Sequence, residues 1–316
     1  DIVSDVHGES GALLATLDRM GYNANGKHEE GRRLVFVGDL VDRGPDSVTV
    51  VTLVKKLVRS GVAQMVLGNH ELNLLKGSHK HGNHWWWGEA EIIRMDKKAP
   101  SLQVFPPDEA WKTDTLAFFR GLPIALERHD VRVCHACWHK ESIEAVRGFR
   151  GDCMQAVEHF RGVAAERVKR MEGEGASEVE LELATQNGSP LAVVTSGVEE
   201  EAPKEYFAGG RMRKTDRAKW WRGYEDDELV VFGHYWRRFK RPQTTPESLG
   251  HLQPSGADPF ADYGETDMLG PKRTAMCIDY SAGVRYEERG AGLPQGGLGT
   301  ALAILRLPER TLHLDS

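Results

Sequence analysis

Five short polar stretches of the chain carry side chains that bind metal ions. They are residues 5–7 (Asp-Val-His), 38–44 (Gly-Asp-Leu-Val-Asp-Arg-Gly), 68–71 (Gly-Asn-His-Glu), 134–136 (Cys-His-Ala) and 233–234 (Gly-His). Their aspartates, asparagine and histidines combine hard oxygen donors with imidazole nitrogen. This donor set suits Mn²⁺, Fe or Zn²⁺ and fits a thiolate-selecting site poorly. The stretches therefore predict a metal centre assembled from distant parts of the sequence.

The second stretch supplies the residue best placed to join two ions. Asp39 directly follows an apolar run, so we assign it as the bridge between two cations roughly 3.5–4 Å apart. The other expected ligands are Asp5 and His7 at the first ion and Asn69, His135 and His234 at the second. Such a pair of divalent cations, with Mn²⁺ favoured, converts water to hydroxide at neutral pH and holds phosphoryl oxygens for in-line attack. The residues thus predict hydrolysis of a phosphoester or phosphoanhydride through metal-bound hydroxide.

Three further residues of these stretches are expected to act without binding metal. Arg43 precedes a Gly-Pro turn that aims its guanidinium group at phosphate oxygens. His70 adjoins the ligand Asn69 and is placed to protonate a leaving oxygen. Asp42 is the natural carboxylate to support the His70 imidazolium.

Taken singly, each stretch has an ordinary structural explanation. An Asp-x-His or Gly-Asp pair is more often a cap or a turn than a ligand, and His135 or His234 alone is equally well a core histidine. The order of the stretches, each following its own apolar run, makes coincidence a poor explanation.

The apolar runs predict how the stretches are brought together. Residues 2–3, 33–37, 64–67, 131–134 and 228–232 are short, rich in β-branched side chains and mostly ended by glycine, which is typical of buried strands. Loops at strand ends meet at one edge of an α/β sheet. We therefore expect an α/β fold with the metal site at strand ends.

At this point the chain resembles the calcineurin-like metallophosphoesterases, and among them the phosphoprotein phosphatase branch. The second and third stretches have that branch's form, and residues 134–136 and 231–234 resemble its two later histidine motifs. Tyr235 and Trp236 follow His234 where other branches often place another histidine. The resemblance implies a metallophosphoesterase fold, a central β-sandwich flanked by helices, with a dinuclear site lacking that extra ligand.

Within the branch the closest resemblance is to bacterial symmetrical diadenosine tetraphosphatases. Residues 116–123, 210–213 and 277–281 are similar to segments of those enzymes. The resemblance implies a second phosphate-clamping arginine at Arg211, with Arg213 as the alternative. It also implies a dinucleoside polyphosphate or related nucleotide as substrate. A protein serine/threonine phosphatase is the alternative, and a non-catalytic scaffold is disfavoured because every proposed ligand is present.

One loop departs from the family pattern and bears on the substrate. Residues 78–87 contain three histidines and three tryptophans. Trp85 and Trp86 could stack on a nucleobase, since aromatic stacking contributes about 1–3 kcal/mol per base. The alternative is that the tryptophans pack beneath the loop while the histidines face water.

A second departure is the segment 140–210, which we expect to be inserted into a single domain covering residues 1–316. Apolar spacing predicts a helix over residues 142–171, weakened in the middle by Gly148 and Gly151 and capping the site. The acidic stretch 172–203, with a turn at residues 187–190, is expected to form a mobile loop.

Composition agrees with a soluble enzyme, and the small number of cysteines favours the reducing cytoplasm. The 316 residues carry a net charge of −6, which argues against a general nucleic-acid binder, although Arg211, Arg213, Lys214 and Arg217 form a local basic group. No apolar run reaches the length of a membrane span. Cys134 and Cys137 are expected to be buried thiols rather than zinc or redox ligands. The chain begins inside the first expected strand, which leaves residues before Asp1 an open question.

Overall fold

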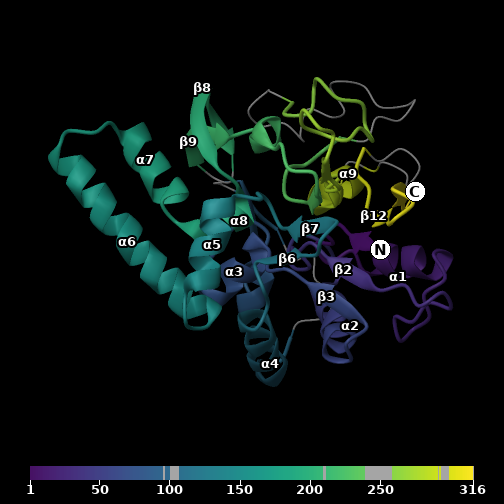
Figure 1. Cartoon of the computed structure of the whole chain (residues 1–316). Helices are drawn as coiled ribbons and strands as arrows, with labels where there is room; N and C mark the ends of the chain where they lie inside the picture. Colours follow the sequence, from purple (N-terminus) through teal and green to yellow (C-terminus); the bar gives the residue numbers. More distant parts are fainter. Residues whose placement is uncertain are drawn as a thin grey trace.

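The computed structural model describes residues 1–94, 97–99, 107–208, 211–238, 258–290, 292 and 299–315 of the chain. Two central sheets lie among helices, with the chain's two ends close to the first sheet (Figure 1). This mixed α/β architecture confirms the predicted fold class.

The first sheet is built around three parallel strands from the start of the chain. Its strand order is β13-β12-β1-β2-β3. The bounds are β1 (Ile2–Val3), β2 (Leu34–Phe36), β3 (Ala63–Met65), β12 (Ala303–Arg306) and β13 (Thr311–Leu314). Val3 pairs with Phe36, and Phe36 pairs with Met65, in parallel register. The strands predicted at residues 2–3, 33–37 and 64–67 are confirmed, and their carboxyl ends point to the same edge.

The second sheet supplies the other two predicted strands. Its order is β11-β10-β7-β6. The bounds are β6 (Ala125–Glu127), β7 (Val131–Cys134), β10 (Leu229–Phe232) and β11 (Ala275–Cys277). β10 is parallel to both β7 and β11. The five strand ends that carry the polar stretches therefore belong to two sheets.

Side chains from the two sheets meet in a shared apolar layer. Ile2 and Val37 of the first sheet's strand segments cluster with Val133, Val231 and Met276 from the second. Because side chains alternate along a strand, Val3 points the opposite way, into a different core. The two sheets thus form the β-sandwich that the resemblance implied.

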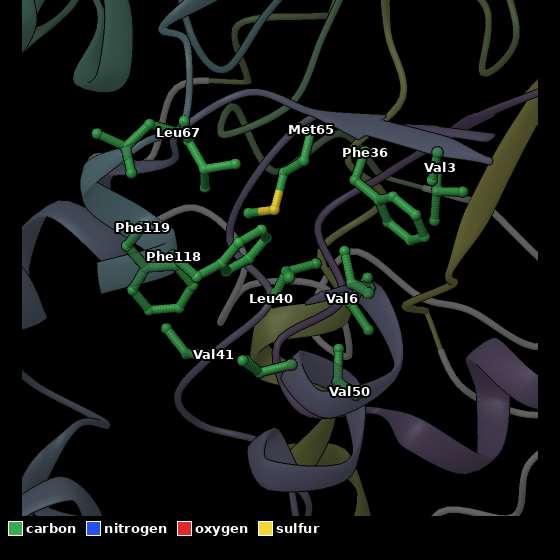
Figure 2. Close-up of a cluster of buried hydrophobic side chains, with 14 of the residues drawn as sticks. Val3, Val6, Phe36, Leu40, Val41, Val50, Met65, Leu67, Phe118 and Phe119 are labelled. Atoms are coloured by element: carbon green, nitrogen blue, oxygen red, sulfur yellow. The ribbon is translucent and has the colours of Figure 1, made fainter. Parts of the chain in front are cut away.

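Helices cover the outer face of the first sheet. They are α1 (Ser10–Arg19), α2 (Ser47–Arg59), α3 (Asn69–Leu75) and α4 (Glu109–Arg120). Figure 2 shows Val6, Phe36, Leu40 and Val50 pointing toward one another in this core. Asp46 begins α2 by accepting a hydrogen bond from the Thr49 N–H. The loop between β2 and α2 therefore ends at a defined cap.

The segment 140–210 contains more regular structure than the sequence predicted. It forms α5 (Lys140–Gly148), α6 (Cys153–Gly173), α7 (Glu178–Asn187), α8 (Pro190–Ser196) and β8 (Glu199–Ala208), and β8 pairs with β9 (Arg211–Arg217). In Figure 1, α6 and α7 lie side by side and project from the sheets.

Two predictions for this segment are wrong in detail. The single helix expected over residues 142–171 is broken at Phe149, and Asp152 starts a new helix by accepting hydrogen bonds from the Met154 and Gln155 N–H groups. The expected acidic loop is largely helical. Ser177 caps α7 through a capping box with Glu180, a short-range signal that outweighs the local charge.

The remaining described elements are short. They are the 3₁₀ helices η1 (His84–Trp87), η2 (Trp220–Gly223) and η4 (Ala282–Val284), the helix α9 (Arg285–Gly290), and the paired strands β4 (Glu91–Arg94) and β5 (Lys97–Ala99). Cys134 and Cys137 are free and buried, as predicted, and burial raises the pKa of both thiols. No helix in the described part of the chain has the length and apolar character that a membrane crossing needs.

A buried ion pair joins the C-terminal segment to α9, and breaking it should lower the free energy of unfolding. Arg285, which is 1% exposed, donates to both carboxylate oxygens of Asp315 at 2.6 and 3.0 Å. Arg285→Met should lower the free energy of unfolding by about 3–5 kcal/mol, because it leaves a buried carboxylate unpaired. Urea denaturation measures the change.

The matched control is Arg222, whose pair with Asp262 is exposed on both sides. Arg222→Met should cost less than about 1 kcal/mol. Equal losses for the two variants would contradict the role given to burial.

Candidate metal centre

The loops after five strands of the two sheets converge on one carboxylate. His7, Asp39 and His70 place ligand atoms within 4.8 Å of one another, and so do Asp39, His135 and His234. All five side chains are buried. Asp39 belongs to both groups, which is the geometry required of a residue that bridges two cations.

Asp39 is held in place through its backbone. Its φ is +51°, in the left-handed region that residues other than glycine seldom adopt. The Glu71 carboxylate accepts hydrogen bonds from the Asp39 and Leu40 N–H groups at 2.9 and 2.7 Å, and from the Gly68 N–H at 3.1 Å. Glu71 therefore ties the loop after β2 to the loop after β3.

The side chain of Asp39 faces the histidines of both groups. Its Oδ1 accepts a hydrogen bond from the His70 N–H at 3.0 Å. Its Oδ2 lies 3.3 Å from His135 Nε2 and 3.7 Å from His7 Nε2. Burial alone would raise the pKa of Asp39, but the adjoining His135 and His70 hold that pKa well below its usual range. The carboxylate is thus charged and available as a ligand.

Backbone carbonyls orient two of the histidine rings. The Nδ1–H of His7 donates to the Val41 carbonyl at 2.9 Å, and that of His135 donates to the Val37 carbonyl at 2.8 Å. This orientation directs the Nε2 atom of each ring toward Asp39, as in most histidine-ligated metal sites. Burial lowers the pKa of His135, but the Asp39 carboxylate outweighs burial and raises that pKa to about 10, so a metal ion would displace the Nε2 proton of this ring.

Asp5 and Asn69 lie beside these groups. Asp5 Oδ2 accepts a hydrogen bond from the His234 N–H at 3.1 Å, whereas its Oδ1 is buried and has no hydrogen-bond partner within the described residues. The Asn69 Oδ1 lies 3.0 Å from His135 Nε2. Burial raises the pKa of Asp5 well above its usual value, and Asp279 nearby raises it further. Buried, mutually repelling oxygen donors of this kind fit divalent cations.

Glycines allow the loops to approach this closely. A Cβ on Gly233 would lie 1.9 Å from Asp5 Oδ1, and a Cβ on Gly68 would lie 2.3 Å from Asp39 Oδ1. Any larger residue at either position would displace a proposed ligand. Close contact with the proposed ligands thus explains why glycine occupies positions 68 and 233.

His70 and Asp42 form a short buried hydrogen bond next to the proposed ligands. The His70 Nδ1–H donates to Asp42 Oδ2 at 2.5 Å, and His70 Nε2 lies 3.9 Å from Asp39 Oδ2. Burial lowers the pKa of His70 to about 3, with Asp39 opposing and Arg43 reinforcing the shift. The structure thus brings together the acid and the orienting carboxylate expected from the sequence, and it also counts His70 among the possible ligands.

Arg43 presents an unsatisfied cation to the centre. Its Nε and Nη1 atoms are buried without a hydrogen-bond partner in the part of the chain that the structure describes. The guanidinium group lies 5.1 Å from the ring centroid of Trp236, and the Arg43 N–H donates to the Gly82 carbonyl at 3.0 Å. A held guanidinium group with free donors suits an anionic ligand such as phosphate.

Arg217 is a site residue that the sequence did not single out. Its Nη1 donates to the His234 carbonyl at 2.6 Å, and its charge contributes to lowering the pKa of His234, after burial. Arg213 lies about 13 Å further along the strand and faces Glu199 at 3.7 Å. The side chain of Arg211 lies outside the described residues. The sequence could have indicated Arg217, because side chains two and four residues apart along a strand lie on the same face, which places Arg217 with Arg213.

The tryptophan loop adopts the packing alternative. Trp85 is 3% exposed and Trp86 is 6% exposed, so neither indole offers a free face to a nucleobase. His79 is exposed, but His84 is buried, which departs from the expectation that the histidines face water. The loop therefore packs its tryptophans into the core beside the site.

The fold and its ligand arrangement define a metallophosphoesterase. The family model described as calcineurin-like phosphoesterase matches residues 1–164 of this chain. The chain belongs to the calcineurin-like phosphoesterase family, as the sequence predicted.

Named relatives are similar over part of the chain. The asymmetrical bis(5'-nucleosyl)-tetraphosphatase PrpE of Bacillus subtilis is 40% identical over 114 residues, covering 33% of this chain and 47% of the relative. The symmetrical bis(5'-nucleosyl)-tetraphosphatase of Vibrio campbellii is 33% identical over 135 residues, 43% of each chain. This chain thus spans about half the length of the curated relatives it matches. A solved cold-active protein tyrosine phosphatase aligns with 99% of this chain and 77% of its own at TM-score 0.43 and 16% identity.

Removing the shared carboxylate should empty the centre. Asp39→Asn is expected to reduce bound Mn²⁺ from about two ions per chain to fewer than one, because a neutral amide bridges cations poorly. Elemental analysis after dialysis measures the content. Asp18→Asn, an exposed change on α1, serves as control. Full metal retention in Asp39→Asn would contradict the bridging assignment.

Arg213 and Arg217 of β9 should differ in their effect on catalysis. Arg217→Ala is expected to lower kcat/KM for an aryl phosphate about tenfold or more, as expected on losing a charged hydrogen-bond donor. Arg213→Ala should have a much smaller effect because its group lies farther from His234. Steady-state kinetics with Mn²⁺ present decide the order, and a larger loss for Arg213→Ala would reverse the assignment.

Proposed function

We propose that this chain hydrolyses a phosphoanhydride bond of a dinucleoside polyphosphate or related nucleotide with two divalent cations. The observation that carries the proposal is the Asp39 carboxylate, which belongs to both ligand groups at once. The substrate class rests on relatives named bis(5'-nucleosyl)-tetraphosphatases. Mn²⁺ is the proposed ion, with Fe or Zn²⁺ as alternatives that suit the same donors.

The ligands divide the charge between two positions. Asp5 and His7 would hold one cation, Asn69, His135 and His234 would hold the other, and Asp39 would join them. Bound divalent cations neutralise phosphoryl oxygens and lower the pKa of water. The buried, unpartnered Asp5 Oδ1 supports this ligand set.

Arginines would bind and orient the phosphoryl group. The unpartnered donors of Arg43 supply one side of the clamp, and Arg217 beside His234 supplies the other. A planar guanidinium group pairs with two phosphate oxygens at once, so the pair would align the scissile bond. Each arginine has a neighbouring aromatic ring, Trp236 for Arg43 and Tyr235 for Arg217.

His70 would move a proton to the leaving oxygen. Asp42 holds the Nδ1–H of the ring, so the proton passes from Nε2, the atom that faces Asp39. To act as the acid the ring would carry protons on both nitrogens, and the Asp42 carboxylate at Nδ1 would stabilise that imidazolium.

Trp236 is an aromatic side chain available for a nucleoside end. It is half-buried, follows the proposed ligand His234 by two residues, and stacks against the Arg43 guanidinium group. An indole in this place suits a nucleobase next to a bound phosphate. The protein serine/threonine phosphatase alternative rests on the metal motifs that both classes share.

The wider setting is proposed on the same basis. We assign residues 1–316 to one domain in which residues 140–210 are an insertion, because β9 returns the chain directly to the metal centre. The four free cysteines favour the reducing cytoplasm. A phosphorylated small molecule is the proposed partner.

A substrate panel tests the function. With Mn²⁺ present, diadenosine tetraphosphate should be hydrolysed with a higher kcat/KM than phosphopeptides, capped RNA or cyclic nucleotides. Chromatography of the products separates two ADP from AMP plus ATP, which assigns symmetrical or asymmetrical cleavage. Asp39→Asn should be inactive on every substrate. A clear preference for phosphopeptides would overturn the nucleotide assignment.

A further inference from the structure

A buried tryptophan bonds to the carboxylate oxygen of Asp42 that His70 does not use. The indole Nε1–H of Trp85 donates to Asp42 Oδ1 at 2.8 Å, while Asp42 Oδ2 accepts the His70 Nδ1–H at 2.5 Å. Trp85, Asp42 and His70 are 3%, 0% and 4% exposed. The three groups therefore form a hydrogen-bonded chain that is shielded from bulk solvent.

This arrangement restrains the orientation of the Asp42 carboxylate. The Ser47 hydroxyl accepts a hydrogen bond from the Asp42 N–H at 2.9 Å, which holds the backbone at its left-handed φ of +74°. With the backbone fixed, rotation about the side chain would still change which oxygen meets His70. A donor on Oδ1 selects one rotation, and a bond to a carboxylate in a buried site is stronger than one in water.

The same loop also supports the phosphate-binding side chain. Trp85 belongs to η1, and Gly82 just before it accepts a hydrogen bond from the Arg43 N–H at 3.0 Å. A Cβ on Gly82 would lie 2.6 Å from Arg43 Cγ, so the loop packs tightly against that side chain. The loop at residues 78–87 thus contacts Asp42, which orients His70, and Arg43, which is proposed to bind phosphate.

We infer that Trp85 is a positioning residue that acts through Asp42 on the His70 ring. The inference rests on the proposed function and gives the tryptophan loop a role in turnover. Trp86 differs, because it packs edge-on against Trp85 and near Trp111. Trp85 therefore sets the geometry of the proton donor, and the base-recognition role considered for it does not apply.

The test removes the indole N–H and keeps an aromatic ring. Trp85→Phe should lower kcat for an aryl phosphate about tenfold with KM changed less than about twofold, since the lost bond orients a group used in turnover. The bound Mn²⁺ should stay equal to that of the parent chain. Trp111→Phe is the matched control, because it removes an indole donor to Thr52 at 2.9 Å away from the centre.

A double-mutant cycle separates positioning from general support. If Trp85 acts through Asp42, Trp85→Phe should change kcat less than about twofold in an Asp42→Asn background. A tenfold loss in both backgrounds, or loss of Mn²⁺ in Trp85→Phe, would mean that the tryptophan only maintains the structure. An unchanged kcat in Trp85→Phe would also overturn the inference.

A readout independent of activity completes the design. Proton NMR of ¹⁵N-histidine-labelled protein should show a far-downfield Nδ1–H resonance that disappears in His70→Asn. Trp85→Phe should shift or broaden it, and Trp111→Phe should leave it unchanged. A parent chain inactive on all substrates would refute the proposed function, whereas an active parent with an unmoved resonance in Trp85→Phe would refute this inference alone.

Discussion

Three buried carboxylates, Asp5, Asp39 and Asp279, lie close enough to perturb one another, and this concentration of negative charge is the constraint on which the rest depends. Burial and mutual repulsion raise the pKa of Asp5 and Asp279, whereas neighbouring histidines keep Asp39 ionised. Such a cluster is costly without compensating positive charge. The imidazole rings, the guanidinium group of Arg43 and the divalent cations proposed to bind here would offset this negative charge.

Holding these oxygens together requires a rigid backbone, and the loops achieve it with few residues. Glu71 accepts three backbone hydrogen bonds and so joins the loops after β2 and β3. Gly233 and Gly68 allow chain segments to approach within contact of Asp5 and Asp39. In the loop at residues 78–87, the Trp85 indole donates a hydrogen bond to Asp42, and the Gly82 carbonyl accepts one from the Arg43 N–H. The reactive groups are therefore restrained from both directions, which is what precise positioning of catalytic groups requires.

Local patterns predicted much of the fold, and the errors have physical causes. The five strands were recognisable because each is short, apolar and β-branched. The helix expected over residues 142–171 failed because Asp152 offered a stronger start signal than the apolar spacing offered continuity. The acidic stretch was misread because the capping box at Ser177 stabilises a helix despite its charge. Arg217 was predicted only as part of a local basic group, because Arg211 and Arg213 carried the family resemblance.

The sequence by itself determined the donor types, their order and the strands that carry them, because these depend on residue identity and short-range periodicity. The sequence also predicted Asp39 as the bridge. Only the tertiary structure decided that His70 joins a ligand group with Asp39, that Arg217 rather than Arg213 approaches His234, and that Trp85 contacts Asp42. The last two outcomes depend on contacts between separate loops and strands, since Trp85 lies 43 positions from Asp42 and Arg217 lies 17 positions from His234. The centre as a whole also joins the two sheets, as at Asp5 and His234, which are 229 positions apart, and no local pattern in the chain encodes such contacts.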